Sequence, residues 1–253
     1  MRMHVLCGGR LRLRRRVYFP DADRAETIDV PVSCFLIRHK QGNVLFDTGC
    51  HPSVVTDAEA RWGELTRIIT SLSSPQENVI AELSAIGVAP QDVDIVVNSH
   101  FHPDHCGCNE FFRRATVLCH AAELAVVKQA DAAARGYVAA DWDQPIPLET
   151  IEAEHDLFGD GRVVLIPLPG HTPGCIGALV GLDRSGSFLL ASDAVSIRAN
   201  LDRDIVPRNT WDAERLARTF GEIRRIEADG TTVICGHDQE QWIGLRKSAD
   251  AYD

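Results

Sequence analysis

The first quarter of the chain alternates apolar and polar residues with the two-residue period of β-strands. Residues 10–14 read Arg-Leu-Arg-Leu-Arg, which predicts a half-buried strand with the leucines on one face and the arginines on the other. Residues 30–37 and 43–46 are largely apolar, and they predict two further strands joined by a turn at Gln41-Gly42. We interpret the arginines as a solvated strand face rather than an anion-binding or membrane patch, because acidic residues follow closely in the sequence.

A helix is predicted to follow this strand-rich region. Ser74-Pro75-Gln76-Glu77 has the spacing of a capping box with proline at the first helical position, so we expect a helix through Ile86 that ends at Gly87. The long connection before it contains Trp62 and residues 65–72. These residues either form a lid or an acyl-chain pocket, or they pack one apolar helical face on the body of the protein. Their spacing fits one helical face, so we favour the packing interpretation.

The second half of the chain continues with predicted strands and helices. Residues 121–134 predict one helix, and residues from about 212 to 226 predict another with its cap at Thr210. Four short apolar segments predict strands, at residues 93–97, 162–168, 187–191 and 232–235. Each of the four is followed within a few residues by histidine or aspartate. Functional sites of α/β proteins lie at the carboxyl ends of buried strands, so we expect a site there.

Length and composition restrict the class of protein. The 253 residues, 45% of them hydrophobic and 25% charged, fit a single domain spanning residues 1–253. A net charge of −10 argues against nucleic acid as a partner. No apolar run approaches the roughly 20 residues that span a bilayer, and no apolar stretch near the N-terminus precedes a cleavage site. We therefore expect a cytoplasmic protein that acts on a small molecule and binds neither nucleic acid nor membrane.

The densest group of potential metal ligands is the run His100-Phe101-His102-Pro103-Asp104-His105. His100 and His102 share one face of an extended segment because they are two residues apart, and the other two ligands follow within one turn. His171, Asp193 and His237 stand at the other three strand ends, which gives seven candidate ligands. A catalytic zinc ion usually has three protein ligands and one open position. Seven ligands therefore fit two metal ions that share a carboxylate.

This ligand set predicts hydrolytic chemistry. Imidazole and carboxylate groups suit zinc, and also iron, manganese or cobalt. Two such cations lower the pKa of a bridging water from 15.7 toward about 7 and polarise a carbonyl or phosphoryl oxygen. The sequence contains no Gly-Xaa-Ser-Xaa-Gly motif, no phosphate-binding loop and no dinucleotide fingerprint. We therefore predict a metal-dependent hydrolase.

Other histidines and cysteines are interpreted as structural. Five histidines are not accompanied by other potential metal ligands: His4, His39, His51, His120 and His155. His51 differs from the others in that it lies in a loop at the end of a predicted strand. Cys106 and Cys108 flank the histidine run, but eight scattered cysteines in a chain of this length indicate packing residues and free thiols rather than metal ligands.

The motifs resemble those of a known family. Ser-His-Phe-His-Pro-Asp-His-Cys-Gly at residues 99–107 resembles the His-x-His-x-Asp-His signature of the metallo-β-lactamase superfamily, and within it the chain is most similar to the N-acyl-homoserine lactonases. The similarity covers nearly the whole chain. It includes Leu45-Phe46-Asp47-Thr48-Gly49, Pro169-Gly170-His171-Thr172-Pro173-Gly174, Ser192-Asp193-Ala194 and Gly236-His237-Asp238-Gln239-Glu240-Gln241.

The resemblance implies an α/β (α+β) fold, the αββα sandwich, in which two mixed β-sheets lie face to face with helices outside. It assigns His100, His102 and His171 to one metal ion. It assigns Asp104, His105 and His237 to the other, with Asp193 and a hydroxide bridging both. In the lactonases this hydroxide attacks the lactone carbonyl, and an aspartate passes a proton to the departing ring oxygen. Asp104 and Asp193 are the candidates for that catalytic proton transfer, and the implied role is quorum quenching.

The choice of substrate depends on one departure from the lactonase pattern. Lactonases of this type commonly have a tyrosine three residues after the bridging aspartate, where this chain has Ser196. A serine hydroxyl is shorter by a phenyl ring, and losing one oxyanion donor can cost about 10²–10³ in rate. The alternative to a homoserine lactone is therefore another lactone, a thioester or another ester, cleaved by the same fold and metals.

Overall fold

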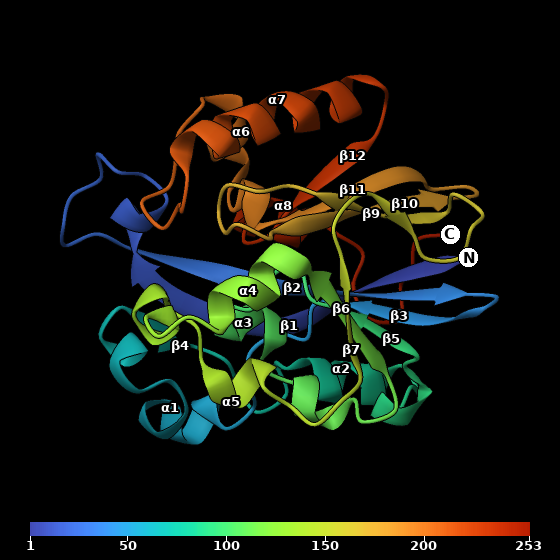
Figure 1. Cartoon of the computed structure of the whole chain (residues 1–253), viewed down its shortest axis with the longest axis horizontal. Coiled ribbons are helices and arrows are strands. Elements are labelled where there is room, and N and C mark those ends of the chain that lie inside the picture. The colour runs from blue at the N-terminus through green and yellow to red at the C-terminus, as the bar shows by residue number, and fades with distance from the viewer.

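Two β-sheets pack face to face between layers of helices in the computed structural model, which describes residues 1–253 (Figure 1). The first sheet has seven strands in the order β4 (Ile69–Ser71), β1 (Arg2–Arg14), β2 (Thr27–His39), β3 (Gly42–Phe46), β5 (Ile95–Val97), β6 (Thr116–His120) and β7 (Leu148–Ile151). The second has five, in the order β12 (Thr232–Cys235), β11 (Gly186–Ser192), β10 (Ile176–Leu182), β9 (Val163–Pro167) and β8 (His155–Asp156). Both sheets mix parallel and antiparallel pairs.

The inner faces of the two sheets form the main hydrophobic core. Phe46 and Val97 of the first sheet and Leu165 and Leu190 of the second belong to one cluster of 18 buried residues. Burial of apolar area on this scale is the main free-energy gain of the sandwich. The predicted sandwich fold is confirmed.

Helices cover the outer faces of both sheets (Figure 1). In chain order the helices of the protein are α1 (Val54–Trp62), α2 (Val79–Ala85), α3 (Pro103–Cys106), α4 (Ala121–Val127), α5 (Ala139–Trp142), α6 (Arg198–Asp202), α7 (Ala213–Ala228) and α8 (Gln239–Gly244). On α7, Leu216, Phe220 and Ile223 recur at helical spacing and are buried against the second sheet. On α2, Val79 and Leu83 do the same against the first sheet.

One predicted helix start and two predicted capping residues are wrong, because a different side chain caps each helix. The Glu77 carboxylate accepts from the Ser74 N–H at 2.8 Å, as in a capping box, but the helix begins only after Asn78, whose side chain accepts from Ala81 N at 2.9 Å. The predicted end at Gly87, which has φ +71°, is close to the observed end. The later helix α7 is capped by Asp212 rather than Thr210.

The helix predicted over residues 121–134 is interrupted. It divides into α4 and a 3₁₀ helix at Ala132–Arg135. The turn between the two lets Val126, Val127 and Ala132 pack together against Phe101, inside the loop that holds the histidine run. Tertiary packing therefore overrides the local helix preference here.

The connection over residues 62–72 does not form the single helical face that we favoured. Gly63–Arg67 is a 3₁₀ helix, and β4 pairs antiparallel with β1, with Ile69 opposite Leu13. Trp62 is packed in the interior at 5% exposed, and Leu65 and Ile69 pack against the same cluster. The packing interpretation is therefore confirmed for these three residues, whereas Ile68 is 58% exposed.

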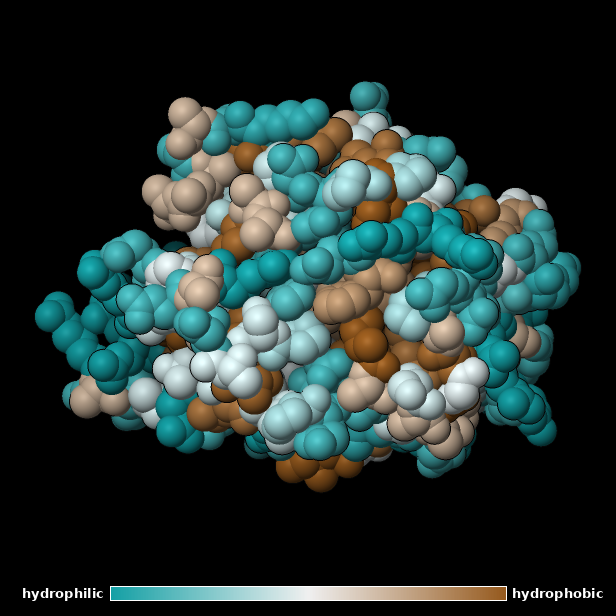
Figure 2. Space-filling view, turned by 90° about the horizontal axis from the view of Figure 1, so that it is seen from below, coloured by the Kyte–Doolittle hydropathy of each residue, from teal (hydrophilic) through white to brown (hydrophobic).

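The outer surface is mixed in character. In Figure 2 apolar side chains form separate small patches among hydrophilic ones. Arg12 and Arg14 of β1 are exposed to solvent as expected, and Arg12 pairs with Asp29 at 2.6 Å. Arg15, in the turn after β1, pairs with Glu26 at 3.5 Å. No helix combines the length and the apolar character needed to cross a bilayer.

Candidate metal centre

All seven predicted ligands converge where strand ends from the two sheets meet. His100 to His105 follow β5 of the first sheet, whereas the others follow β9, β11 and β12 of the second. Five of them are buried at 5% exposed or less, namely His100, His105, His171, Asp193 and His237. His102 and Asp104 are partly exposed and line a pocket above the cluster. The structure therefore unites residues up to 137 positions apart in the chain, from His100 to His237.

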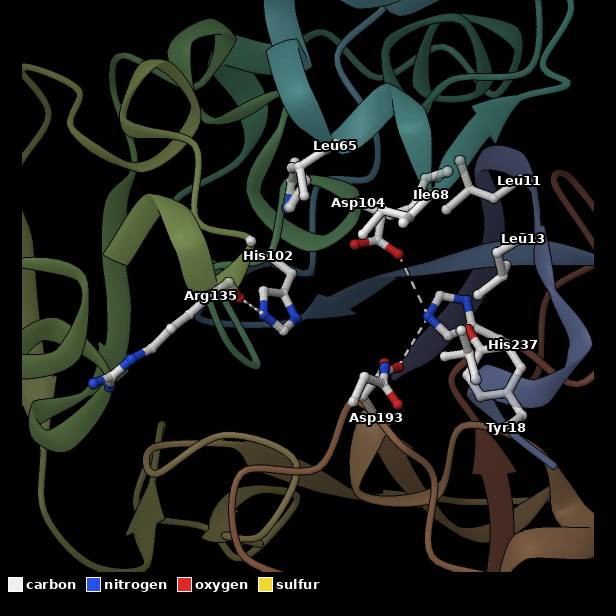
Figure 3. Close-up of a pocket in the computed structure, with 15 residues that line it drawn as sticks. Leu11, Leu13, Tyr18, Leu65, Ile68, His102, Asp104, Arg135, Asp193 and His237 are labelled. Carbon is white, nitrogen blue, oxygen red and sulfur yellow. Dashed lines mark hydrogen bonds and ion pairs between the residues drawn. The ribbon is translucent and has the colours of Figure 1, made fainter. Parts of the chain in front are cut away.

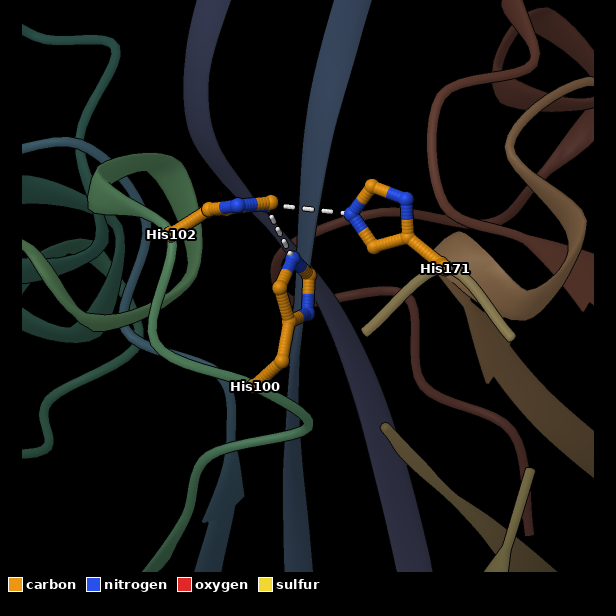
Figure 4. A group of neighbouring side chains, drawn as sticks. All are labelled: His100, His102 and His171. Atoms are coloured by element: carbon orange, nitrogen blue, oxygen red, sulfur yellow. Dashed lines mark hydrogen bonds between the residues drawn. The ribbon is translucent and has the colours of Figure 1, made fainter. Parts of the chain in front are cut away.

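Three imidazoles form the first group (Figure 4). His102 Nδ1 lies 3.0 Å from Nε2 of His100 and 3.0 Å from Nε2 of His171. Burial and the neighbouring imidazoles lower the pKa of His100, and burial lowers the pKa of His171 to about 3. Both rings are therefore neutral near pH 7 and offer a nitrogen lone pair to a cation.

Asp104, His105 and His237 form the second group. The Asp104 Oδ2 atom lies 3.5 Å from His237 Nε2 and 3.7 Å from His105 Nε2. Burial opposes a charge on His105, but Asp104 and Asp47 outweigh it and raise the pKa of His105 to about 10. The local field therefore favours positive charge, which a divalent cation supplies.

Asp193 lies between the two groups and faces both. Its Oδ1 is 3.0 Å from His237 Nε2 and 3.6 Å from His105 Nε2, while its Oδ2 is 3.5 Å from His171 Nε2. Burial disfavours its charge, but His237 and His171 overcome that effect and hold the pKa of Asp193 well below its usual value. Each oxygen of one ionised carboxylate is thus directed to a different group of ligands.

Two buried atoms at the centre of the cluster make no well-formed hydrogen bond. His105 Nε2 has no partner, and Asp193 Oδ1 lies 3.0 Å from His237 Nε2 without the geometry of a hydrogen bond. An unpartnered buried polar atom costs free energy, and metal coordination removes that cost. The two trios and the shared carboxylate fit two divalent metal ions in donor type, number and position.

Hydrogen bonds from the outside fix the orientation of the histidine rings. Nδ1 of His105 donates to Asp47 Oδ2 at 2.8 Å, and Nδ1 of His237 donates to the Pro31 carbonyl at 2.8 Å. Nε2 of His102 donates to the Arg135 carbonyl at 3.2 Å. In each ring the other nitrogen is left free to face the centre, which is how proteins set the tautomer of a metal-binding histidine.

Asp47 is a functional residue to which the sequence reasoning assigned no role. It follows β3 with φ +59°, and its Oδ1 and Oδ2 accept from the N–H and hydroxyl of Ser99 at 2.7 and 2.8 Å. The signal was present, since Asp47 ends a predicted strand in a motif shared with the lactonases. Asp47 ties the end of β3 to the start of the histidine run.

Gly236, which precedes His237, allows Asp193 to occupy its central position. A Cβ atom on Gly236 would lie 2.5 Å from Asp193 Oδ1, well inside van der Waals contact. Any other residue here would therefore displace the shared carboxylate or the backbone that carries it.

A pocket opens over the cluster (Figure 3). Its floor contains His102, Asp104, Asp193 and His237. Its walls include apolar side chains from β1, the turn after β1 and the connection before α2: Leu11, Leu13, Val17, Leu65, Ile68 and Ile69. From the sequence, we considered a role in a pocket only for residues 65–72, and we favoured packing over a pocket for them. Leu65, Ile68 and Ile69 do line it.

Ser196 is not part of the pocket wall. Its side chain is 1% exposed, and its hydroxyl is buried without a hydrogen-bond partner. The Ser196 hydroxyl is therefore not positioned to donate a hydrogen bond to a substrate in the pocket, as a tyrosine at this position would.

The residues interpreted as structural lie in none of the candidate metal groups. They are His4, His39, His51, His120, His155, Cys106 and Cys108. His51, which lies in the loop after β3, contacts Glu110 at 2.9 Å instead. All eight cysteines are buried free thiols.

The fold and the ligand constellation agree with the comparison to protein families. The model of the metallo-beta-lactamase superfamily matches residues 27–237. The chain belongs to the metallo-β-lactamase superfamily.

Relatives within the superfamily are N-acyl homoserine lactonases. AiiB of Agrobacterium fabrum is 32% identical over 243 residues, which cover 89% of this chain and 86% of the relative. AttM of Azorhizobium caulinodans is 29% identical over 260 residues, which cover 100% and 99%. A solved N-acyl homoserine lactone hydrolase, with the product N-hexanoyl-L-homoserine bound at its catalytic metal centre, has a TM-score of 0.89 and 22% identity, covering 99% of this chain and 98% of the other. That likeness shows a shared fold.

Proposed function

We propose that this chain is a dinuclear-metal hydrolase that opens the lactone ring of N-acyl homoserine lactones. The observation that carries the proposal is the position of Asp193, whose two oxygens face two separate ligand groups on the floor of a pocket. The names of the relatives support the substrate class, and the apolar pocket wall supports an acylated substrate.

The proposed ligands are those predicted from the sequence. His100, His102 and His171 would hold one ion, and Asp104, His105 and His237 the other, with Asp193 shared. The mixture of imidazole and carboxylate is best suited to zinc. When bound, two such ions supply an acidified water with a pKa near about 7 and polarise the carbonyl that is attacked.

The two aspartates take different parts in this proposal. Asp193 faces both ligand groups, so its carboxylate would bind both metal ions and fix their relative position. Asp104 contacts the histidines through Oδ2, and its side chain is 14% exposed against 5% for Asp193. The Asp104 carboxylate is therefore the group placed to carry a proton to the departing ring oxygen.

The pocket wall would take the acyl chain and keep bulk water from the reacting ester. Ile68 lies next to Leu11 at the edge of the pocket (Figure 3), and Ile69 of β4 is the strand partner of Leu13 on β1. Burying one methylene group contributes about 0.8 kcal/mol, so each added pair of carbons that reaches the wall should tighten binding by about 15-fold at most. We expect a preference for acyl chains long enough to reach it.

A panel of substrates tests the proposal. Protein carrying two zinc ions per chain is assayed by proton release with N-hexanoyl homoserine lactone, γ-butyrolactone and an acyl thioester. We expect the homoserine lactone to be opened fastest. A higher kcat/KM for the thioester or the plain lactone would overturn the substrate assignment. Absence of hydrolysis of all three would overturn the hydrolase.

A further inference from the structure

Tyr18 reaches the pocket from outside every motif discussed above. It follows the 3₁₀ turn Arg15–Val17 at the end of β1, and its side chain is only 3% exposed. It lines the pocket together with Asp104, Asp193 and His237 (Figure 3). Its ring centroid is 6.2 Å from that of His237, with the two planes inclined by 33°. Tyr18 therefore lies beside the proposed metal centre rather than at the distant end of the pocket.

The Tyr18 hydroxyl differs from the other two phenol groups of the chain. Tyr137 donates to Glu123 Oε1 at 2.9 Å, and the Tyr252 hydroxyl accepts from Arg246 N at 3.0 Å. Tyr18 has no such partner in the protein, although it is the most deeply buried of the three at 3% exposed. A buried hydroxyl usually finds a partner, so this one is available to a ligand.

The Tyr18 hydroxyl has an O–H that can donate a hydrogen bond, whereas the aspartate carboxylates around it only accept.

The backbone of this segment is held firmly from the opposite side. The Tyr18 carbonyl accepts from Asn200 Nδ2 at 2.9 Å, and the Val17 carbonyl accepts from Arg208 N at 2.7 Å. Arg208 also donates to the Pro20 carbonyl at 2.8 Å. Asn200 is itself fixed, because its Oδ1 accepts from Ile197 N at 3.0 Å. These bonds position the phenol before any ligand arrives.

Tyr18 is the only hydroxyl-bearing residue in the pocket lining. The Arg135 guanidinium is paired with Asp131 at 2.7 Å, and Asn209, which carries the side-chain amide of the lining, is exposed. Ser196, the hydroxyl on the Asp193 loop itself, is buried outside the pocket.

We propose that Tyr18 is a catalytic residue whose hydroxyl donates a hydrogen bond to an oxygen of the substrate's ester group. This inference rests on the proposed function, since it assumes that the ester lies over the Asp104–Asp193 floor. The bond strengthens as negative charge develops on the ester oxygen, so it acts on the rate as well as on binding. The segment formed by β1 and the turn after it thereby contributes a catalytic hydrogen-bond donor as well as apolar side chains of the pocket wall.

The first test compares Tyr18→Phe with the matched variant Tyr252→Phe. Each removes one hydroxyl and keeps the ring, but only Tyr18 lines the pocket. We expect kcat/KM for N-hexanoyl homoserine lactone to fall about 10²-fold in Tyr18→Phe. Zinc content and melting temperature should stay at the wild-type values, and Tyr252→Phe should keep wild-type kcat/KM. A Tyr18→Phe enzyme within twofold of wild type overturns the inference, and so does one that loses zinc or stability, because the hydroxyl would then act on the structure.

The second test does not depend on turnover. The chain has three tyrosines, so labelling their Cζ atoms with ¹³C gives three resonances that report on phenol hydrogen bonds. The probe is N-hexanoyl-L-homoserine, added to the zinc-loaded protein. We expect the resonance missing from Tyr18→Phe to shift, and the dissociation constant to rise several-fold in that variant. If the product binds and this resonance does not move, the Tyr18 inference fails.

The two proposals fail in distinguishable ways. Lactone opening with an unmoved Tyr18 resonance would leave the proposed function standing and remove the role of Tyr18. A shifted resonance in a protein that opens no lactone would retain the Tyr18 contact with the ligand and remove the proposed function.

Discussion

Two segments build the same pocket, and they do so by different means. Residues 100–105 bring four metal-competent side chains within six positions, so their chemistry is evident from local sequence. Residues 11–18 bring two leucines, a valine and a tyrosine to the opposite wall. Nothing in the sequence of these residues distinguishes them from an ordinary half-buried strand and the turn after it. Coordination demands particular residue types close together, whereas a wall demands only that the fold direct suitable side chains inward.

The largest expected effect comes from the ligand side of the comparison. Replacing Asp193 by alanine removes the carboxylate that both ligand groups share. Loss of an outer hydrogen-bond partner of a metal ligand costs about 10–100-fold, so loss of the shared ligand should cost more, about 10³-fold in lactone opening. The measurement is proton release together with zinc per chain, which should fall below two. The matched variant is Asp250→Ala, because Asp250 is exposed and belongs to neither ligand group. Wild-type activity in Asp193→Ala would show that the cluster is not the active centre.

A second variant tests whether position matters as much as ligand identity. Gly236→Ala keeps all seven ligands but places a methyl group 2.5 Å from the present site of Asp193 Oδ1. Misplacement of a reacting group by about 1 Å can cost 10²-fold, and we expect a loss of roughly that size in kcat.

Gly244→Ala is the control for this substitution, because a Cβ there meets no atom within 4 Å. It should keep wild-type kcat. Equal activity of the two glycine variants would mean that the close approach at Gly236 does not constrain the site.

A smaller effect is expected on the wall side. Ile68 is 58% exposed yet lines the pocket, so Ile68→Ser should cost little stability. We expect it to lower the ratio of kcat/KM for decanoyl over butanoyl homoserine lactone by several-fold, because one apolar contact with the longer chain is lost. Ile243→Ser serves as control, since Ile243 is 71% exposed on α8 and does not line the pocket. If both variants change the ratio equally, the wall does not select the acyl chain.

The smallest expected effect is on the pH dependence of stability, and it concerns the half of β1 that does not line the pocket. The carboxyl half of β1 forms the wall, whereas His4 in its amino half donates from Nδ1 to the Ser248 carbonyl at 2.8 Å. Burial lowers the pKa of His4 below 6.5, so on acidification the unfolded chain takes up a proton before the folded one does. The free energy of unfolding therefore falls as the pH drops below about 6.5, with the equilibrium constant changing less than tenfold per pH unit.

Urea unfolding between pH 5.5 and 7.5 measures this slope. His4→Gln should flatten it, while the exposed His155→Gln should leave it unchanged. A wild-type slope in His4→Gln would show that His4 does not contribute to the acid sensitivity.

The sequence was sufficient where a function requires consecutive residues of a particular type. The αββα fold was expected from the family motifs, and all seven candidate ligands were named before their convergence was seen. The sequence did not identify the capping residue of two helices, because two residues with suitable side chains lie within a few positions of each other in each case. Asn78 caps α2 in place of Ser74, and Asp212 caps α7 in place of Thr210.

The pocket wall required the tertiary structure. The alternation in residues 10–14 predicts that Leu11 and Leu13 are turned inward, but not that they turn toward a ligand. That outcome depends on β4 pairing with β1 and on the bonds from Asn200 and Arg208 that hold the segment at residues 17–20. These partners lie between 56 and 191 residues away along the chain, so no local pattern encodes them.

The central claim, a two-metal lactonase, is tested most directly by titrating metal-free protein with zinc and measuring the opening of N-hexanoyl homoserine lactone at each metal content. We predict that activity appears with the binding of the second ion and saturates at two zinc ions per chain. Full activity with one ion or none, or no lactone opening with two ions bound, would contradict it.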